Sequence, residues 1–342
     1  PVAWYSAGLT AMFFEDATVH SLQNLLQPFA RISLTEGTTP LQRMHRLEAA
    51  LGTAVQIYVK RDDLQGLGGG GNKLRKLEFL LGEAQTQQAD TIIAVGGRQS
   101  NFARLTAAAC ARLGLACELM LGQSVPRDDL EYQHNGNVLL DALLGAQVHD
   151  VPAGTATVDA AHARAAVLRA AGRKPYVAVT GGSTPVGCLG YVACADEIAQ
   201  QSAAQGLAWE RIYLANGSSG THAGLAAGWA ALGHPAHQVQ SFAVLHDAAT
   251  THQATLDKTR DTLALMGAAT TVGDSDIVVH GEQRGAGYGI PTDAMREAVQ
   301  LLARTEGLLL DPVYSGKAFA GLLAQVRSGL LPAGSQALFV MT

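Results

Sequence analysis

The chain has 342 residues with a formal net charge of −5, and 48% of its residues are hydrophobic while only 15% are charged. This composition excludes a disordered chain, and the lack of a basic stripe argues against a nucleic-acid partner. No run of about 18 apolar residues occurs, so we expect no transmembrane helix, and a length of about 150 residues per domain predicts two domains.

Short β-rich runs alternate with Ala- and Leu-rich stretches of helical length along the chain. The predicted strands cover residues 55–60, 91–95, 117–121, 147–151, 176–180, 211–214, 239–244, 276–280 and 337–341. The predicted helices cover residues 72–85, 100–113, 136–144, 160–171, 189–205, 221–232, 292–304 and 316–328. This alternation predicts an α/β fold with mainly parallel sheets flanked by helices. Glycine clusters follow several strands, so we expect one ligand cleft at the carboxyl ends of the strands.

The first candidate motif joins the end of a strand, Lys60-Arg61-Asp62-Asp63, to a glycine run and then to Asn72-Lys73-Leu74-Arg75-Lys76 at the start of a helix. The positive helix end and the neighbouring cations disfavour the ammonium form of Lys73. A neutral lysine amine is a nucleophile towards an aldehyde. The plainer interpretation is a solvated cluster of lysine and arginine on a helix.

The second candidate motif, residues 95–104, takes a strand through two glycines into a helix that begins at Ser100 and Asn101. A hydroxyl, an amide and free backbone N–H groups at a helix start form a site suited to a carboxylate. An ordinary helix N-cap is the alternative interpretation.

The third candidate motif, residues 215–224, is rich in glycine and serine between a strand and a helix. Glycines allow the backbone to approach a phosphate, and hydroxyls add hydrogen bonds. It lacks the Gly-Lys-Ser/Thr ending of a nucleotide P-loop, and a plain tight turn is the alternative.

The fourth candidate motif consists of two glycine-flanked loops, residues 287–291 and 311–317, each with one tyrosine. Tyr288 and Tyr314 are candidates for proton transfer or ring stacking, and a structural role is the alternative. The four cysteines match no zinc spacing, so we expect buried thiols and no metal site.

Together these motifs resemble the pyridoxal-phosphate enzymes of fold type II, the tryptophan-synthase-β type. Within that type they are most similar to the branch of D-cysteine desulfhydrase, 1-aminocyclopropane-1-carboxylate deaminase and L-cysteate sulfo-lyase. The resemblance spans residues 38–342 and follows the order of the motifs, including Asn135-Gly136-Asn137 and Asp311-Pro312-Val313-Tyr314-Ser315-Gly316-Lys317. It implies a homodimeric enzyme that binds pyridoxal 5'-phosphate and a small amino-acid substrate.

The resemblance also implies a role for individual residues. Lys73 would hold the cofactor as a Schiff base and then act as the base that removes a proton. Ser100 would contact the substrate carboxylate or its reacting end, and Tyr288 and Tyr314 would line the substrate face. The remaining cofactor-binding residues would be Lys76, Gly217, Ser218, Ser219, Gly220 and Thr221 at the phosphate, Asn101 at the phenolic oxygen and Ser315 at the pyridine nitrogen.

Among the departures from the pattern of this branch, three bear on the substrate pocket. Phe102 stands where His or Gln is common, and we expect its side chain near the substrate, with core packing as the alternative. Arg98 stands where an apolar or small residue is usual. Ser315 replaces the carboxylate that the cyclopropane deaminases carry after the second tyrosine.

The absence of that carboxylate ranks β-elimination above ring-opening deamination. The leading prediction is therefore a carbon–sulfur lyase of the D-cysteine desulfhydrase type, which yields a 2-oxo acid and ammonia. The alternatives are a 1-aminocyclopropane-1-carboxylate deaminase, an L-cysteate sulfo-lyase, and a protein that binds the cofactor or an amino acid without turnover.

We expect a discontinuous large domain, residues 1–75 and 183–342, around a small domain, residues 76–182. The first residues, Pro1-Val2-Ala3-Trp4, lack the basic and apolar segments of a signal peptide, so we expect a cytoplasmic protein.

Overall fold

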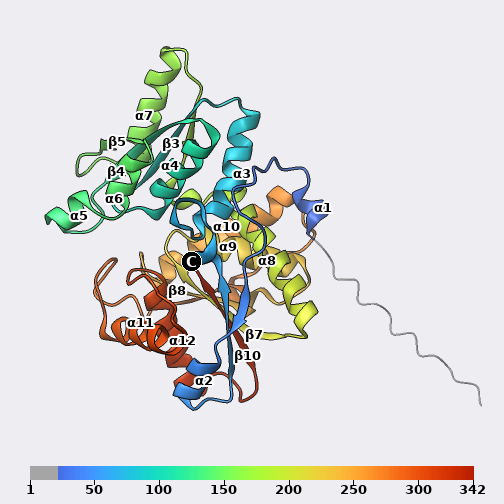
Figure 1. The fold of residues 1–342 in the computed structure, drawn as a ribbon. Helices are drawn as coiled ribbons and strands as arrows, with labels where there is room; N and C mark the ends of the chain where they lie inside the picture. The colour runs from blue at the N-terminus through green and yellow to red at the C-terminus, as the bar shows by residue number, and fades with distance from the viewer. Residues whose placement is uncertain (1–21) are drawn as a thin grey trace, which may run out of the picture.

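The computed structural model describes residues 22–342 and contains two β-sheets with helices around them (Figure 1). Residues 1–21, on which the expectation about a signal peptide depends, lie outside the described residues. Within residues 22–342, no helix is long and apolar enough to cross a membrane. The same part of the chain has no group of His, Cys, Asp and Glu side chains suited to a metal ion.

The larger sheet has the strand order β1-β2-β10-β7-β8-β9. Only the β1–β2 pair is antiparallel, and the other neighbours run parallel. Its strands come from both ends of the chain: β1 (Leu41–Arg43), β2 (Gln56–Arg61), β7 (Trp209–Asn216), β8 (Val239–Ala243), β9 (Val278–His280) and β10 (Gln336–Met341).

The smaller sheet has the order β5-β4-β3-β6 and is parallel throughout. Its strands are β3 (Thr91–Gly97), β4 (Ala116–Gly122), β5 (Gln147–Asp150) and β6 (Pro175–Ala178). The predicted α/β class, with mainly parallel sheets flanked by helices, is confirmed. The domain boundaries at residues 75/76 and 182/183 stay a prediction.

The helices occupy most of the segments between the strands. They are α1 (Gln23–Leu26), α2 (His45–Leu51), α3 (Lys73–Thr86), α4 (Asn101–Leu113), α5 (Leu130–His134), α6 (Asn137–Leu143), α7 (Thr157–Ala170), α8 (Pro185–Gln205), α9 (Gly220–Ala231), α10 (Ala248–Met266), α11 (Asp293–Glu306) and α12 (Ser315–Arg327).

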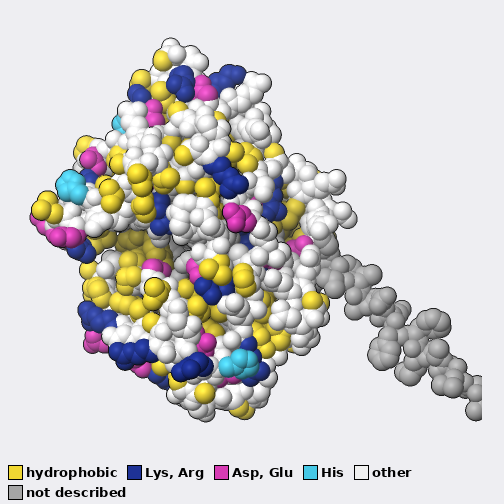
Figure 2. Space-filling model, viewed as in Figure 1, with side chains coloured by type: hydrophobic (Ala, Val, Ile, Leu, Met, Phe, Trp, Pro, Cys, Tyr) yellow, Lys and Arg dark blue, Asp and Glu magenta, His cyan; other side chains and the backbone are white. Residues whose placement is uncertain are grey.

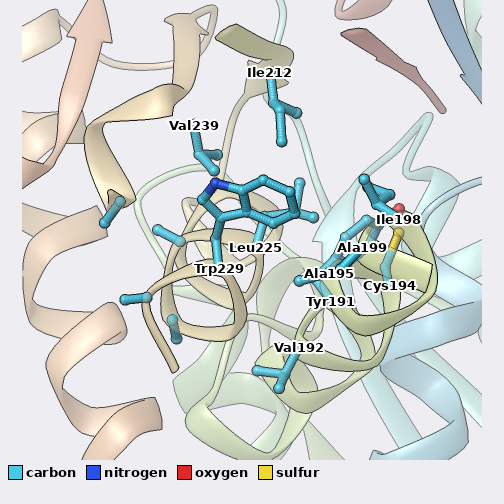
Figure 3. Packing of buried hydrophobic residues seen from close by; sticks show 14 of the residues in the cluster. Tyr191, Val192, Cys194, Ala195, Ile198, Ala199, Ile212, Leu225, Trp229 and Val239 are labelled. Atoms are coloured by element: carbon cyan, nitrogen blue, oxygen red, sulfur yellow. The ribbon is translucent and has the colours of Figure 1, made fainter. Parts of the chain in front are cut away.

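The close packing of α8 against α9 helps to position the third motif. A side chain at Gly224 would place its Cβ 2.3 Å from the carbonyl oxygen of Cys188, so the backbones of the two helices approach closely only because glycine is there. On the same helix, Trp229 packs among buried side chains of α8 and of strands β7 and β8, including Ile212 and Val239 (Figure 3). This core fixes the direction in which α9 leaves the sheet.

The carboxyl ends of β2, β7 and β10 lie together because these strands are parallel neighbours. The chain reaches its last residue, Thr342, in the middle of the molecule, between the two sheets (Figure 1). Figure 2 shows the surface hollowed between the part that carries α5 and the part that carries α11. The strand ends and the loops after them therefore meet between the two sheets, where a parallel fold binds its ligands.

Candidate functional site

Lys73 begins helix α3 directly after a run of four glycines and Asn72. All four glycines have positive φ angles between 59° and 114°, which side chains rarely tolerate. A Cβ at Gly70 would also lie 2.4 Å from the carbonyl oxygen of Gln65. The glycine run is thus required by the tight backbone path that delivers Lys73 to the helix start.

Lys73 is half-buried as a residue, and its Nζ donates to Asn72 Oδ1 at 3.1 Å. Desolvation lowers the pKa of Lys73 well below its ordinary value, and the nearby charge of Lys76 lowers it further, against the opposing effect of Asp311. A lowered pKa favours the neutral amine, and a neutral lysine can act as a nucleophile or as a base.

The glycine- and serine-rich loop after β7 forms a cup at the start of helix α9. Ser219 adopts an unusual positive φ of 70°, and its N–H donates to Asn216 Oδ1 at 3.1 Å. A Cβ at Gly220 would lie 2.6 Å from Ser183 Oγ and 2.8 Å from Lys76 Nζ. The cup therefore has no room for a side chain at its base, and an ammonium group adjoins its helix start.

Lys76 is fully buried beside this cup, and its Nζ donates to the carbonyl of Gly181 at 3.2 Å and to Ser183 Oγ at 3.1 Å. Both acceptors are neutral. Desolvation lowers the pKa of Lys76 to about 8. Ser183 Oγ in turn lies 2.7 Å from Ser218 Oγ. An ammonium, two hydroxyls and a helix N-terminus at one point favour a bound anion.

A hydrogen bond joins the start of α3 directly to the cup. Asn72 Nδ2 donates to Thr221 Oγ1 at 2.9 Å. The amide of Asn72 therefore contacts both the amine of Lys73 and the start of α9. The structure brings Lys73, Lys76 and residues 217–221 into one site.

The two predicted tyrosines also meet at this site. Their hydroxyl oxygens lie 2.5 Å apart, and burial raises the pKa of both Tyr288 and Tyr314. A Cβ at Gly217 would lie 3.2 Å from Tyr314 Cε1, so this ring borders the cup. Lys317 supports the loop that carries Tyr288, because its Nζ donates to the carbonyl of Gly287 at 3.0 Å.

Asp311 organises the loop that leads into α12. Its Oδ1 accepts from the N–H of Tyr314 at 2.6 Å, and its Oδ2 accepts from the N–H of Ser315 at 2.8 Å. The buried Ser315 hydroxyl donates to the carbonyl of Thr342 at 3.1 Å. One carboxylate thus fixes both Tyr314 and Ser315, and it lies near enough to Lys73 to affect its pKa.

Ser100 and Asn101 stand at the start of helix α4, after β3. Ser100 Oγ caps the helix by accepting from the N–H of Ala103 at 3.2 Å. Asn101 Oδ1 accepts from Asn137 Nδ2 at 2.9 Å. Arg104 links this group to the glycine run, because it donates to Asn137 Oδ1 at 3.0 Å and to the carbonyl of Gly70 at 3.1 Å.

The expectation that Phe102 faces the substrate is wrong. Its side chain is 1% exposed and packs in the hydrophobic core with Leu80. Consecutive residues of a helix point about 100° apart, so Phe102 is turned away from the direction of Asn101. Phe102 is a core residue, as the alternative interpretation held. Arg98 forms an ion pair with the exposed Asp150 at 2.5 Å.

Sequence reasoning assigned no role to Ser183, Asn216 or Asp311. Ser183 follows Gly181 and Gly182 in the turn after β6, and that glycine pair is the signal that could have identified it. Asn216 lies in the third motif and Asp311 in the fourth, but their acceptor roles depend on backbone geometry that residue types alone do not reveal.

Comparisons with known proteins agree over most of the chain. A family model described as "Pyridoxal-phosphate dependent enzyme" matches residues 32–342. A 1-aminocyclopropane-1-carboxylate deaminase of Methylobacterium nodulans is 37% identical over 319 residues, which cover 92% of this chain and 94% of that protein. A protein of the same name from Mesorhizobium japonicum is 38% identical, with the same coverage.

Solved structures show the same likeness. A structure described as an ACC deaminase homologue is 35% identical and matches with a TM-score of 0.83, covering 94% of both chains. A hydrogen sulfide-producing enzyme from Fusobacterium nucleatum is 16% identical, with a TM-score of 0.60 over 90% of this chain and 95% of that chain. At that identity the second likeness shows the fold alone.

Proposed function

Because the chain belongs to the pyridoxal-phosphate-dependent enzymes, in the branch that includes 1-aminocyclopropane-1-carboxylate deaminase, we propose that it deaminates a small amino acid by eliminating a group from the β-carbon. When bound, pyridoxal phosphate supplies an electron sink for the bonds that break. The observation that carries the proposal is the low-pKa amine of Lys73 beside an anion cup that contains a second buried lysine.

The residues of the site fit this cofactor. Within the described chain, the hydrogen bonds of Lys76 go to neutral oxygens, so its buried charge gains a partner when a phosphate is present. We assign the phosphate to Lys76 and to the cup formed by Gly217, Ser218, Ser219, Gly220 and Thr221. Lys73 would hold the aldehyde carbon, Asn101 the phenolic oxygen and Ser315 the pyridine nitrogen.

The substrate would lie on the side of the two tyrosines. Lys73, once its amine is free, would remove a proton and return one. Ser100, at the start of α4, would bind the substrate carboxylate together with free backbone N–H groups. The hydroxyls of Tyr288 and Tyr314 share a hydrogen bond at 2.5 Å, and their raised pKa values keep both protonated, so they can supply a proton to a leaving group.

The choice of β-elimination rests on Ser315. Its side chain is a neutral hydroxyl, which donates to the main-chain oxygen of Thr342, so the side chain itself presents no negative charge to a pyridine nitrogen. A nitrogen with such a partner stays largely unprotonated, which favours rapid loss of a β-substituent such as thiolate. A second candidate, opening of a cyclopropane ring, is supported by the names of relatives at 37% and 38% identity.

One panel of substrates tests this proposal. Purified holoenzyme is incubated with D-cysteine, L-cysteine, L-cysteate, D-serine, L-serine and 1-aminocyclopropane-1-carboxylate, and ammonia is measured with sulfide, sulfite and 2-oxobutyrate. We expect the largest turnover to release sulfide. Dominant release of 2-oxobutyrate from the cyclopropane substrate would favour the second candidate. A cofactor absorption band without turnover of any substrate would indicate a binding protein.

A charge introduced at Ser315 should change the preference between the two reactions. Ser315→Glu places a carboxylate where the cyclopropane deaminases carry one, so we expect sulfide release to fall by about tenfold or more relative to ring opening. Ser315→Gln is the matched control, because it adds similar bulk without charge. If both variants change the ratio of sulfide to 2-oxobutyrate equally, bulk and not charge determines the preference.

The expected homodimer and cytoplasmic location rest on the resemblance and on sequence features, and both stay predictions. The same holds for the division into residues 1–75 and 183–342 around residues 76–182.

A further inference from the structure

The segment Asn135-Gly136-Asn137 has no part in the chemistry above, but it is bound closely to the start of helix α4. The backbone N–H of Asn137 donates to Gln99 Oε1 at 2.9 Å, and Asn137 Nδ2 donates to the carbonyl of Gln99 at 2.9 Å. Gln99 Nε2 returns a hydrogen bond to the carbonyl of Asn135 at 2.9 Å. Asn137 is therefore held in a single position relative to α4.

Arg104 determines which end of the Asn137 amide is the oxygen. A guanidinium can only donate, and Arg104 Nη1 lies 3.0 Å from Asn137 Oδ1. The other end of this amide, Nδ2, must therefore donate to Asn101, whose Oδ1 accepts at 2.9 Å. Because its oxygen is engaged in this way, Asn101 has its Nδ2 available as a donor on its opposite side.

We propose that Asn137 is a positioning residue that fixes the orientation of the Asn101 amide, so that Asn101 presents a donor and not an acceptor to the cofactor. This inference rests on the proposed contact between Asn101 and the phenolic oxygen. An amide free to turn would present its oxygen to that oxygen in part of the molecules, and two acceptors repel. Arg104 also holds the glycine run before Lys73 in place, because its Nη2 donates to the carbonyl of Gly70 at 3.1 Å.

Asn137→Asp is designed to reverse the orientation of Asn101. A carboxylate keeps its contact with Arg104 as an ion pair, but it cannot donate to Asn101 or to the carbonyl of Gln99. The amide of Asn101 would then turn, donate its Nδ2 to the new carboxylate and present its oxygen to the cofactor. Asn135→Asp is the matched control, because it adds the same charge at an exposed neighbouring position whose side chain, within residues 22–342, accepts only from the N–H of Gly136.

The readout is the pH midpoint at which the visible absorption band of the bound cofactor titrates, and thermal melting without cofactor checks that each variant folds. We expect Asn137→Asp to raise the midpoint by about one pH unit or more, since a hydrogen bond to a charged oxygen is lost. Asn137→Ala should give a smaller shift in the same direction. Asn135→Asp should match the unaltered protein.

Asn101→Ala distinguishes a failure of the proposed contact between Asn101 and the phenolic oxygen from a failure of the inference about Asn137. A midpoint unchanged in Asn101→Ala would show that Asn101 does not contact the phenolic oxygen, and the proposed cofactor role of that residue would fail. If Asn101→Ala shifts the midpoint while folded Asn137→Asp and Asn137→Ala both match the unaltered protein, Asn137 does not position Asn101 and only the inference about Asn137 is overturned.

Discussion

Replacement of Lys73 by alanine is expected to abolish covalent attachment of the cofactor and to reduce turnover by a factor of about 10²–10⁴ or more. The variant removes both the group that holds the aldehyde carbon and the base that moves protons. Reduction of the holoenzyme with borohydride, followed by peptide mapping, should place the pyridoxyl group on the peptide that contains Lys73. Lys174→Ala is a control for loss of a lysine, because its amine contacts only Gln88 among the described hydrogen bonds.

The structure gives a physical reason for choosing Lys73 over the other buried lysines. Lys60 is fully buried, but its amine is engaged in an ion pair with Glu197 and in a hydrogen bond to the carbonyl of Thr39. The Nζ of Lys76 is engaged with Gly181 and Ser183. Lys73 has a pKa well below its ordinary value and is only half-buried as a residue at the start of α3. A pyridoxyl group found on Lys60, Lys76 or Lys317 after borohydride reduction would contradict the assignment of Lys73.

The alternation of strands and helices predicted much of the fold, since each predicted strand and helix has a counterpart in the structure. Helix α10 was not predicted, although it has 19 residues. Its buried threonines have low helix propensity, and the hydroxyls of Thr255 and Thr259 donate to carbonyls one turn back. Packing against the rest of the molecule, which sequence patterns do not reveal, therefore determines this helix.

The motifs predicted the candidate site for a related reason. Glycine runs and helix starts are local features, and local patterns placed Lys73 and the residues of the cup correctly at helix starts. The same local patterns did not predict which way a side chain points from its helix, because Phe102 lies in the core and does not face the substrate. Partners distant in the chain, such as Asp311 for the loop of Tyr314, depend on a backbone path that the sequence alone did not indicate.

A large loss of stability is expected when Asp62 is replaced. Asp62 belongs to a buried network of hydrogen bonds and ion pairs that includes Arg75 at the start of α3. Asp62 is fully buried, and it accepts hydrogen bonds from Arg75, from the hydroxyl of Thr39 and from the hydroxyl of Tyr191. Arg75 is two residues from Lys73 and also pairs with Glu197 on α8 at 2.8 Å. The network thus ties the end of β2 and the first turn of α3 to helix α8.

Asp62→Ala should lower the free energy of unfolding by about 3–5 kcal/mol, because it leaves the buried guanidinium of Arg75 without its main partner. Cofactor occupancy should fall as well, since the first turn of α3 loses its attachment. Asp63→Ala is the matched control in the same motif. Asp63 pairs with Arg61, and both side chains keep some contact with solvent, at 13% exposure for Arg61 and 24% for Asp63, so we expect a loss of about 1 kcal/mol, well below that of Asp62→Ala. Urea unfolding of both variants, followed by circular dichroism at pH 7, measures the difference.

The pH dependence of this difference tests its electrostatic origin. Burial raises the pKa of Asp62, but Arg75, the Tyr191 hydroxyl and Lys60 together outweigh burial and hold the pKa below its ordinary value. A carboxyl whose pKa is lowered on folding contributes stability that is complete above its unfolded pKa of about 3.9 and is lost as the pH falls through the folded value. The difference in unfolding free energy between the unaltered protein and Asp62→Ala should therefore be constant from pH 7 to about pH 5 and should decrease in stronger acid. If this difference stays the same down to the lowest pH at which both proteins fold, lost packing, and not the ion pair, destabilises the variant.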